Sequence, residues 1–461
     1  MPAPDGMLHL DALAASGPFR GRQRQPVLDV AGGPVAELTM APSLLVDRSL
    51  AALRRARPAP PDERAYLITR AAELFATATV AGQTVEQYQH AVSRVGGLPI
   101  SVVRGSTTAV AARLVRAYRS VQAARPAGAV TDWRDPLTRT GRAVWCRRGD
   151  VFAVLAAGNH PGTHSLWPEA LAMGYRVAIR PSTREPFTPH RLISCLRLAG
   201  FGDDQVVLLP TDHDRADGLL RGADLGLVYG GQDVVRKYGA RPDVLAQGPG
   251  RSKILLTRDV DWRDHLDLIV DSVGHHGGTG CVNATAVFVE GDPAALSEAL
   301  AQRFSMWPSL PPQDDKAVLP VQAAGVARRV AGHLRSRAGD AKAWLGWERV
   351  VDELGDGSAA LRPAVYQLDR PDDQRTGVEL SFPCVWVAPW STADGIRPLR
   401  DTLVLTALTR DDRLVDDLVA EPTIRNVYLG DQPTYTIEPG LPHDGYLAEF
   451  LMRSKALIRE G

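Results

Sequence analysis

Apolar and polar positions recur with two different periods along this chain, and the change between them divides the sequence into regions. From about residue 62 to 123, apolar residues such as Leu67 and Ala71 recur at helical spacing, so this region is predicted to be mainly helical. The first 60 or so residues are rich in Pro, Ala and Arg and are predicted to be irregular, with one apolar-periodic stretch near 44–53.

Between about residues 150 and 250, short apolar runs alternate with amphipathic stretches. Strands that alternate with helices at this spacing predict a parallel sheet with crossover helices, the architecture typical of nucleotide-binding domains. The predicted strands are 151–155, 176–179, 205–209 and 225–229, and the predicted helices are 165–173, 189–198 and 216–220.

A second α/β unit is predicted to begin near Arg251. Residues 254–256 are predicted to form a strand, and the apolar residues between Trp262 and Val273 fall on one face of a predicted helix. That helix ends at a glycine-rich turn, after which 286–289 is predicted to form the next strand.

Composition excludes several classes of partner. The chain has 461 residues, with 53 Lys+Arg and 53 Asp+Glu, so no overall positive field would attract nucleic acid or an anionic membrane surface. No apolar run approaches the roughly 18 residues needed to span a bilayer. The N-terminal MPAPDGMLHLDALAASG has no basic start and contains two aspartates, so it does not resemble a secretory signal. We therefore expect a soluble, cytoplasmic protein.

The four cysteines, Cys146, Cys195, Cys281 and Cys384, have no spacing typical of a zinc site or a disulfide framework, so no metal is expected. Three of them stand in apolar or strand-like surroundings and are interpreted as small buried hydrophobes. Cys281 differs, because it sits in the glycine-rich break Gly277-Gly278-Thr279-Gly280-Cys281 between an amphipathic segment and an apolar run. A thiol in such a loop is predicted to be a nucleophile.

A second polar group complements this thiol. Asn159, in Gly158-Asn159-His160-Pro161, follows the strand-like run 151–157 and precedes a helical pattern. Its side-chain amide is predicted to donate a hydrogen bond to the oxyanion that forms when Cys281 attacks a carbonyl. His275 and His276 lie just before the nucleophile and either tune its charge or cap the preceding helix.

The order of these motifs resembles the aldehyde dehydrogenase superfamily, over roughly residues 60 to 450. Arg180-Pro181-Ser182 stands where that family has a lysine-proline-serine cofactor segment, and Gly230-Gly231 stands where it has a glycine turn before a cofactor-facing helix. Glu379, followed by Phe382-Pro383, resembles the glutamate that holds the nicotinamide ribose. Cys281 and Asn159 match the nucleophile and the oxyanion amide.

The resemblance implies an α/β fold with three parts. A Rossmann-type nucleotide-binding domain is expected from 1–127 and 150–250, and an α/β catalytic domain from 251–435. Residues 128–149 and 436–461 do not fit the alternation and are expected to form a small oligomerisation extension, which implies a homodimer or homotetramer.

One departure from the family concerns the base. Family members that hydrolyse their acyl intermediate use a glutamate at the position of Gln247, and a glutamine cannot take a proton from water as a carboxylate would. The segment Gln247-Gly248-Pro249-Gly250 instead resembles the acylating branch, which transfers acyl groups to or from a thiol. We therefore expect that no carboxylate near the sulfur releases the acyl group, and we infer the reductive direction, in which a thioester on Cys281 is reduced to an aldehyde.

The other departure concerns the cofactor. NAD-preferring members often carry a glutamate three residues after the lysine, whereas this chain has Thr183, between Arg180 and Arg184. Loss of that carboxylate removes a charge repulsion, and guanidinium groups pair with phosphate in bidentate fashion. NADPH is therefore expected in preference to NADH, with Arg180, Ser182, Thr183, Arg184, Gly230, Gly231 and Glu379 as the cofactor-binding residues.

Three functions follow from this interpretation. The leading one is an NADPH-dependent reductase of an activated acid, supplied as a coenzyme A thioester, a carrier-protein thioester or an adenylate from a partner ligase. The second is an aldehyde oxidiser that hydrolyses its thioester with another base. The third is a non-catalytic relative that binds a partner or a small ligand.

Overall fold

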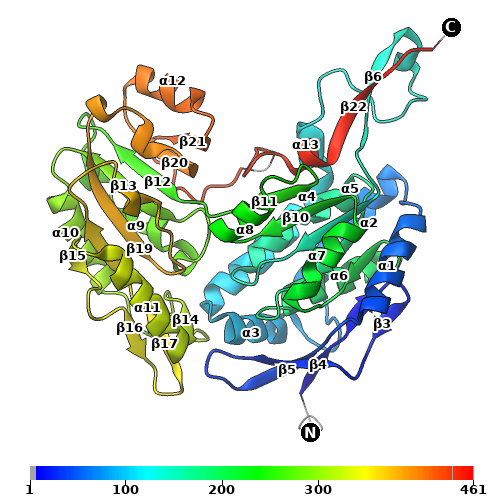
Figure 1. The fold of residues 1–461 in the computed structure, drawn as a ribbon, viewed down its shortest axis with the longest axis horizontal. Coiled ribbons are helices and arrows are strands. Elements are labelled where there is room, and N and C mark those ends of the chain that lie inside the picture. The colour runs from blue at the N-terminus through cyan, green and yellow to red at the C-terminus, as the bar shows by residue number, and fades with distance from the viewer. Residues whose placement is uncertain (1–6, 439, 460–461) are drawn as a thin grey trace.

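Two seven-stranded sheets, each covered by helices on both faces, form the two lobes of the chain in a computed structural model (Figure 1). The structure describes residues 7–438 and 440–459, so the remaining residues of the predicted domain ranges lie outside it. The mixed α/β architecture confirms the predicted fold class.

The first sheet contains the strands predicted between residues 150 and 250. Its five strands from β11 to β9 are parallel, and the four of them that were predicted are almost completely buried, which explains why they are continuous apolar runs in the sequence. The order across this sheet is β11 (Val244–Gln247), β10 (Leu225–Tyr229), β7 (Val151–Leu155), β8 (Arg176–Arg180), β9 (Val206–Leu208), β2 (Ala12–Ala14) and β3 (Gly17–Phe19).

Helices cover both faces of this sheet because successive strand residues point to opposite sides. Phe152 and Val154 pack into a core with α2, α4 and α6, whereas Val151 and Ala153 pack into a separate core with α1 and α7. The helices of this lobe are α1 (Ser43–Arg55), α2 (Pro61–Thr77), α3 (Val85–Gly96), α4 (Ile100–Ala123), α5 (Pro168–Ala172), α6 (Phe187–Ala199), α7 (His213–Gly222) and α8 (Gln232–Tyr238).

The second sheet is parallel except for its edge strand β15. Helices α9 and α10 pack on one face, and α11 and α12 pack on the other. Its strands are, in order, β15 (Lys342–Leu345), β18 (Ala364–Gln367), β19 (Cys384–Trp390), β13 (Ala284–Glu290), β12 (Ser252–Leu256), β20 (Thr402–Leu408) and β21 (Ile424–Leu429), and its helices are α9 (Leu266–Gly274), α10 (Ala294–Ser305), α11 (Ala324–Ala338) and α12 (Asp412–Ala420).

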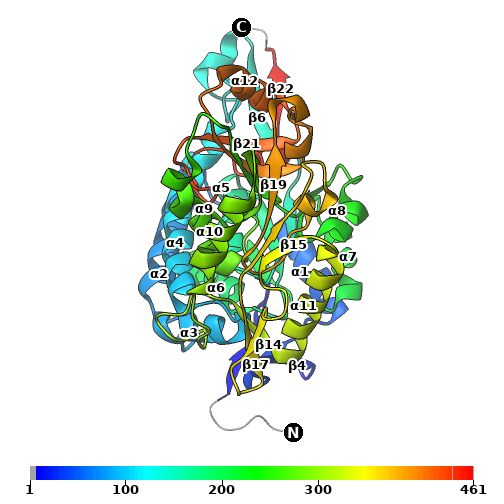
Figure 2. The same cartoon turned by 90° about the vertical axis from the view of Figure 1, so that its left-hand side faces the viewer.

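A two-stranded arm projects from the first lobe (Figures 1 and 2). Strand β6 (Arg142–Arg147) pairs antiparallel with β22 (Met452–Leu457), which follows the short helix α13 (Leu447–Leu451). The two strands come from the two segments, 128–149 and 436–461, that the sequence sets apart from the α/β alternation.

Two sequence-based expectations about secondary structure were wrong. The first 60 residues are not irregular, because besides β2, β3 and α1 they form a sheet of β1 (Leu8–Leu10), β5 (Pro34–Thr39) and β4 (Arg24–Leu28). These strands have only three to six residues, and β2 also depends on a distant partner, since Leu13 pairs with Leu208. The helix expected over 165–173 is only α5, five residues long, preceded by a 3-10 turn at Pro161–Ser165.

A backbone hydrogen bond connects the two lobes at the end of α3. Gly97 adopts the left-handed conformation, with φ of +67°, and its carbonyl accepts a hydrogen bond from the Val321 N–H at 2.8 Å. Val321 begins β14 (Val321–Ala323), which pairs with β17 (Ser358–Leu361) and thus with β16 (Val351–Glu353). A Cβ at Gly97 would lie 1.8 Å from the Val321 carbonyl oxygen, so only glycine allows this approach.

Gly97→Ala is therefore expected to destabilise the protein. The left-handed backbone costs an L-residue roughly 1–2 kcal/mol, and the overlap with Val321 adds roughly 1–3 kcal/mol. Gly82→Ala is the matched control, because Gly82 has φ of +77° but nothing lies within 4 Å of an added Cβ. Urea denaturation should show a larger loss of unfolding free energy for Gly97→Ala than for Gly82→Ala, and equal losses would contradict the packing argument.

Candidate active site

The loop that carries Cys281 has an unusual backbone. Helix α9 ends at Gly274, and His276, Gly277 and Gly278 then have φ of +53°, +71° and +67°. A Cβ at Gly278 would lie 2.4 Å from the Pro383 nitrogen, so glycine is required there. Three consecutive left-handed residues turn the chain sharply, and such strain is concentrated at functional sites.

Hydrogen bonds then fix the position of Cys281. The Asn283 side-chain oxygen accepts the Gly280 N–H at 2.8 Å, while its amide donates to the His275 carbonyl at 2.8 Å. On the opposite side, the Ser252 hydroxyl donates to the Cys281 carbonyl at 3.0 Å. A Cβ at Gly250 would lie 1.7 Å from that same carbonyl oxygen. The nucleophile loop is therefore held between the end of α9 and the start of β12.

The structure brings the two predicted catalytic residues to the same loop. Asn159 follows β7 in the first lobe, and its Nδ2 donates to the Thr279 carbonyl at 3.2 Å, two residues before Cys281. The Asn159 side chain is exposed, so it is accessible to a bound molecule. An amide donor thus contacts the loop that carries the thiol, and its oxyanion role stays a prediction.

The thiol itself is uncharged at neutral pH. Burial raises the pKa of Cys281 to about 12, with further increases from the carboxylates of Glu379 and Asp444 and a small opposing effect of Arg113. Two carboxylates thus act on the sulfur, and the expectation that no carboxylate near it releases the acyl group stays a prediction. Glu379 is held by the backbone, since its carboxylate accepts the Arg251 N–H at 2.8 Å.

A histidine that the sequence analysis missed contacts the sulfur. His443 Nε2 lies 3.8 Å from Cys281 Sγ, within hydrogen-bond distance for sulfur. His443 belongs to the range 436–461 that was assigned to the oligomerisation extension, so part of that range reaches the site instead. The only local signal was a histidine in a Gly- and Pro-containing loop, Gly440-Leu441-Pro442-His443-Asp444-Gly445.

The rings of three histidines and Tyr435 stack at the loop that carries Cys281. The rings of His160 and His276 stack with centroids 4.7 Å apart, His276 and His275 are 3.7 Å apart, and His275 stacks on Tyr435 at 3.7 Å. Burial lowers the pKa of His160 to about 3 and those of His275 and His276 to about 4. These histidines are neutral at pH 7, so they place no positive charge beside the thiol.

A cavity of about 470 Å³ opens beside this loop. It combines residues of the predicted site with residues of α11 that the sequence analysis missed. Arg329 and His333 are the basic side chains that α11 contributes, so an anionic group fits on that side. The lining residues are Asn159, Thr279, Gly280, Val326, Arg329, Val330, His333, Glu379, Leu380 and Ser381.

In the predicted cofactor segment at the end of β8, the side chains of Arg180 and Arg184 point to different parts of the structure. Arg180 is 5% exposed, its Nε donates to the Thr211 carbonyl at 3.1 Å, and its Nη2 is buried without a hydrogen-bond partner among the described residues. Arg184 points elsewhere, because its Nη2 donates to Gln322 of β14 at 2.8 Å and to the Gly96 carbonyl at 3.2 Å. Ser182 and Thr183 are half-buried between them.

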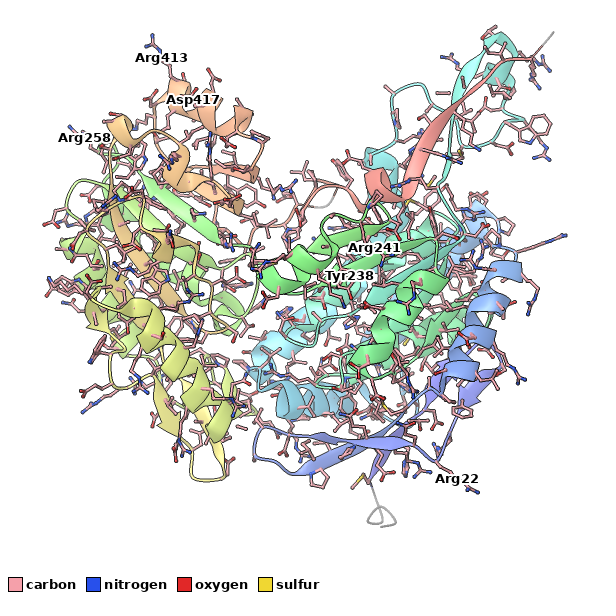
Figure 3. All side chains as sticks on the ribbon, in the orientation of Figure 1. Arg22, Tyr238, Arg241, Arg258, Arg413 and Asp417 are labelled. Carbon is pink, nitrogen blue, oxygen red and sulfur yellow. The ribbon has the colours of Figure 1, made fainter. Side chains whose placement is uncertain are left out.

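The glycine turn before α8 is open on one side. Nothing lies within 4 Å of a Cβ added to Gly231, whereas one added to Gly230 would overlap Val234. Burial lowers the pKa of Arg180, and this effect is partly opposed by Asp212 and by Tyr238, which ends α8 and is labelled in Figure 3. The turn at Gly231 thus leaves room for a bound molecule, while the unpartnered nitrogen of Arg180 lies below the surface.

Family comparison agrees with this geometry. The profile of the Aldehyde dehydrogenase family matches residues 25–445, and the chain belongs to this family. A relative in Sinorhizobium fredii, an aldehyde-dehydrogenase-like protein, is 23% identical over 432 residues, which is 87% of this chain and 79% of the relative. Malonate-semialdehyde dehydrogenase 2 of Bacillus mycoides is 28% identical over 155 residues, but that match spans only 31% of this chain and 32% of the relative.

Solved structures share the fold. An NAD-dependent aldehyde dehydrogenase from Sinorhizobium meliloti superposes with a TM-score of 0.83 at 19% identity, covering 99% of this chain and 96% of that one. A 3,6-anhydro-L-galactose dehydrogenase in complex with NAP superposes with a TM-score of 0.82 at 16% identity, covering 97% of this chain and 99% of that one. In the described residues, no helix is long and apolar enough to cross a membrane.

Gly250→Ala tests how the loop is positioned. An added Cβ would displace the Cys281 carbonyl, and a shift of about 1 Å at a reacting atom costs roughly 100-fold in rate. We expect the burst of p-nitrophenolate released from p-nitrophenyl acetate to slow by about that factor, with unchanged circular dichroism. Gly105→Ala, on exposed α4 with open space around it, should leave the burst unchanged. An unaffected burst in Gly250→Ala would contradict the positioning argument.

Proposed function

We propose that this protein is an NADPH-dependent reductase that converts an activated carboxylic acid into an aldehyde through a thioester on Cys281. The observation that carries the proposal is the pairing of the Cys281 loop with the Asn159 amide, together with a glutamine, Gln247, where hydrolysing relatives have a base. The donor is a coenzyme A thioester, a carrier-protein thioester or an adenylate made by a partner ligase.

The chemistry follows from the site. Cys281 Sγ attacks the acyl carbonyl, the oxyanion accepts a hydrogen bond from Asn159, and the leaving group departs to give the thioester. A nicotinamide held with its ribose at Glu379 would supply the hydride for reduction of this thioester, after which the aldehyde leaves and Cys281 is released as a thiolate. Because the leaving group carries its own negative charge away, the acylation step needs no activated water.

Arg180 is the group that supports a preference for NADPH. Its Nη2 has no partner among the described residues, and Thr183 stands where a carboxylate would repel a 2′-phosphate. To bind a 2′-phosphate, Arg184 must first break the hydrogen bonds that its Nη2 donates to Gln322 and to the Gly96 carbonyl. Glu379 is proposed to hold the nicotinamide ribose, from a position on the wall of the 470 Å³ cavity.

One observation favours a second candidate, an aldehyde oxidiser that hydrolyses its thioester. Glu379 and Asp444 lie near enough to raise the pKa of the thiol, so a carboxylate stands close to the acyl position despite Gln247. Burial also raises the pKa of Asp444, which places it closer to the range of a general base. The product released from the thioester separates the two candidates.

The proposal includes a homodimer or homotetramer. The β6–β22 arm extends away from both lobes (Figure 1), and it carries exposed apolar side chains that a second copy of the chain can cover. Trp133 and Leu137, just before β6, are 51% and 53% exposed, and Ile458 after β22 is 86% exposed.

A panel of acyl-CoA and acyl-pantetheine thioesters with NADPH tests the main proposal. We expect NADPH consumption that matches aldehyde formation one to one, and an acyl adduct on Cys281 by mass spectrometry when NADPH is omitted. Cys281→Ala should abolish both signals, whereas Cys195→Ala should retain the adduct. Acid formed from aldehyde and NADP⁺ without added thiol, in place of reduction, would instead support the oxidiser.

Arg180→Lys tests the cofactor assignment. Lysine keeps the charge but loses the bidentate geometry, and a hydrogen bond to a charged group contributes roughly 1.5–3 kcal/mol. The KM for NADPH is therefore expected to rise about tenfold or more, with little change for NADH. Arg221→Lys, on exposed α7, is the control. Equal changes in KM for NADPH and NADH would show that Arg180 does not bind the 2′-phosphate.

A further inference from the structure

His443 lies in a well-defined setting. It follows β21 on the way to α13, and its backbone carbonyl accepts a hydrogen bond from the Asn426 side chain, which ties the loop to the edge of the second sheet. Its Nε2 faces Cys281 Sγ at 3.8 Å. Its Nδ1 is buried and has no hydrogen-bond partner among the described residues. The ring is thus held against the sulfur, and among the described residues its two nitrogens make no other hydrogen bond.

The other ionisable groups around the sulfur are engaged elsewhere. Arg113 of α4 donates to the Ser165 hydroxyl at 3.1 Å, and the Tyr229 hydroxyl donates to the Thr163 carbonyl at 3.2 Å. Glu379 accepts backbone N–H groups of the 250–251 segment, and Asp444 lies 3.7 Å from Arg425. Glu169 and Tyr428 act on Arg113 from further away. Among the described side chains, only the His443 imidazole is hydrogen-bonded to the sulfur.

The two pKa values rule out a preformed ion pair at rest but leave a proton acceptor for a transfer that is concerted with carbon–sulfur bond formation. Burial, with the charge of Arg113, lowers the pKa of His443 to about 4, so its imidazole is neutral at pH 7 and has a lone pair to offer. The thiol is also neutral at this pH, because its pKa lies far above 7. A thiol that must lose its proton as it attacks requires an acceptor within hydrogen-bond reach.

We propose that His443 is a catalytic residue that accepts the Cys281 thiol proton as sulfur attacks the acyl carbonyl and then passes it to the leaving group. This inference rests on the proposed function only in taking Cys281 as the nucleophile. It gives a proton-transfer role to a residue for which neither the motifs nor the family resemblance supplied one.

The step balances in atoms and charge. As the Sγ–C bond forms, the S–H proton moves to His443 Nε2 and the carbonyl oxygen becomes an oxyanion, held by Asn159. The C–S bond of a thioester donor then breaks, and the proton on Nε2 moves to the departing thiolate. No oxidant or reductant is involved. Because Nδ1 faces no carboxylate, the imidazolium is not stabilised as it is in a Ser-His-Asp triad, and it therefore returns its proton quickly.

Alkylation of Cys281 by iodoacetamide tests this role without substrate or cofactor. In the wild-type protein, the imidazole takes the proton, so the rate between about pH 6 and pH 9 should be nearly flat, well above the pKa of His443. In His443→Gln, which keeps a hydrogen-bonding group but cannot take the proton, the rate should rise about tenfold per pH unit, as for an unassisted buried thiol. At pH 7 the variant should be at least about tenfold slower than wild type.

The chain supplies its own controls. Cys146, half-buried in β6, is followed in the same digest by mass spectrometry, and its alkylation rate should be identical in both proteins. His90→Gln, on the surface of α3, should retain the flat profile of Cys281. A slowed Cys146 would indicate that His443→Gln disturbs the whole protein, and His443→Asn, which is shorter, would then be compared at equal thermal stability.

Two outcomes would overturn the proposal. One is an equal rate and an equal pH slope for Cys281 in wild type and in a folded His443→Gln. The other is an unchanged acylation burst with p-nitrophenyl acetate in that variant. A failure of the reductase proposal looks different, because alkylation and the burst would keep their dependence on His443 while no acyl thioester is reduced by NADPH.

Discussion

The position of the Cys281 backbone carbonyl is tightly confined by its neighbours, and the geometry of the site depends on that constraint. Ser252 donates to this carbonyl, and Gly250 approaches it so closely that any side chain would overlap. Both residues stand at the start of β12, which pairs with the strand that follows the nucleophile. The thiol is therefore fixed by the register of two buried strands, and the strained turn before it completes the positioning.

Low polarity is the second property that organises the site. The thiol, the stacked histidines and His443 are all neutral at pH 7 because burial disfavours their charged forms. A neutral thiol is a weak nucleophile until it loses its proton, so the site favours a reaction in which proton removal and carbon–sulfur bond formation occur together. In the proposed reaction the Asn159 amide adds no charge either, since it would stabilise the oxyanion without itself being ionised.

The sequence predicted the parallel core of the first lobe because buried parallel strands, such as β7 and β8, need continuous apolar runs. It also brought Cys281 and Asn159 together, since each stands in a distinctive local motif. It missed the strands of the first 40 residues, which are too short to be recognised without partners such as Leu208. It also missed His443. The contact of this residue with Cys281 depends on the path of a loop tied by Asn426, and such a loop has no periodic signal in the sequence.

Arg184 illustrates a further limit, because its partner Gln322 lies 138 residues away in the other lobe. That contact and the Gly97–Val321 hydrogen bond both cross from the first lobe to the second. A hinge that swung the lobes apart would have to break both tethers, one of which begins two residues from Ser182. Any opening between the lobes would therefore be coupled directly to the position of the segment 180–184.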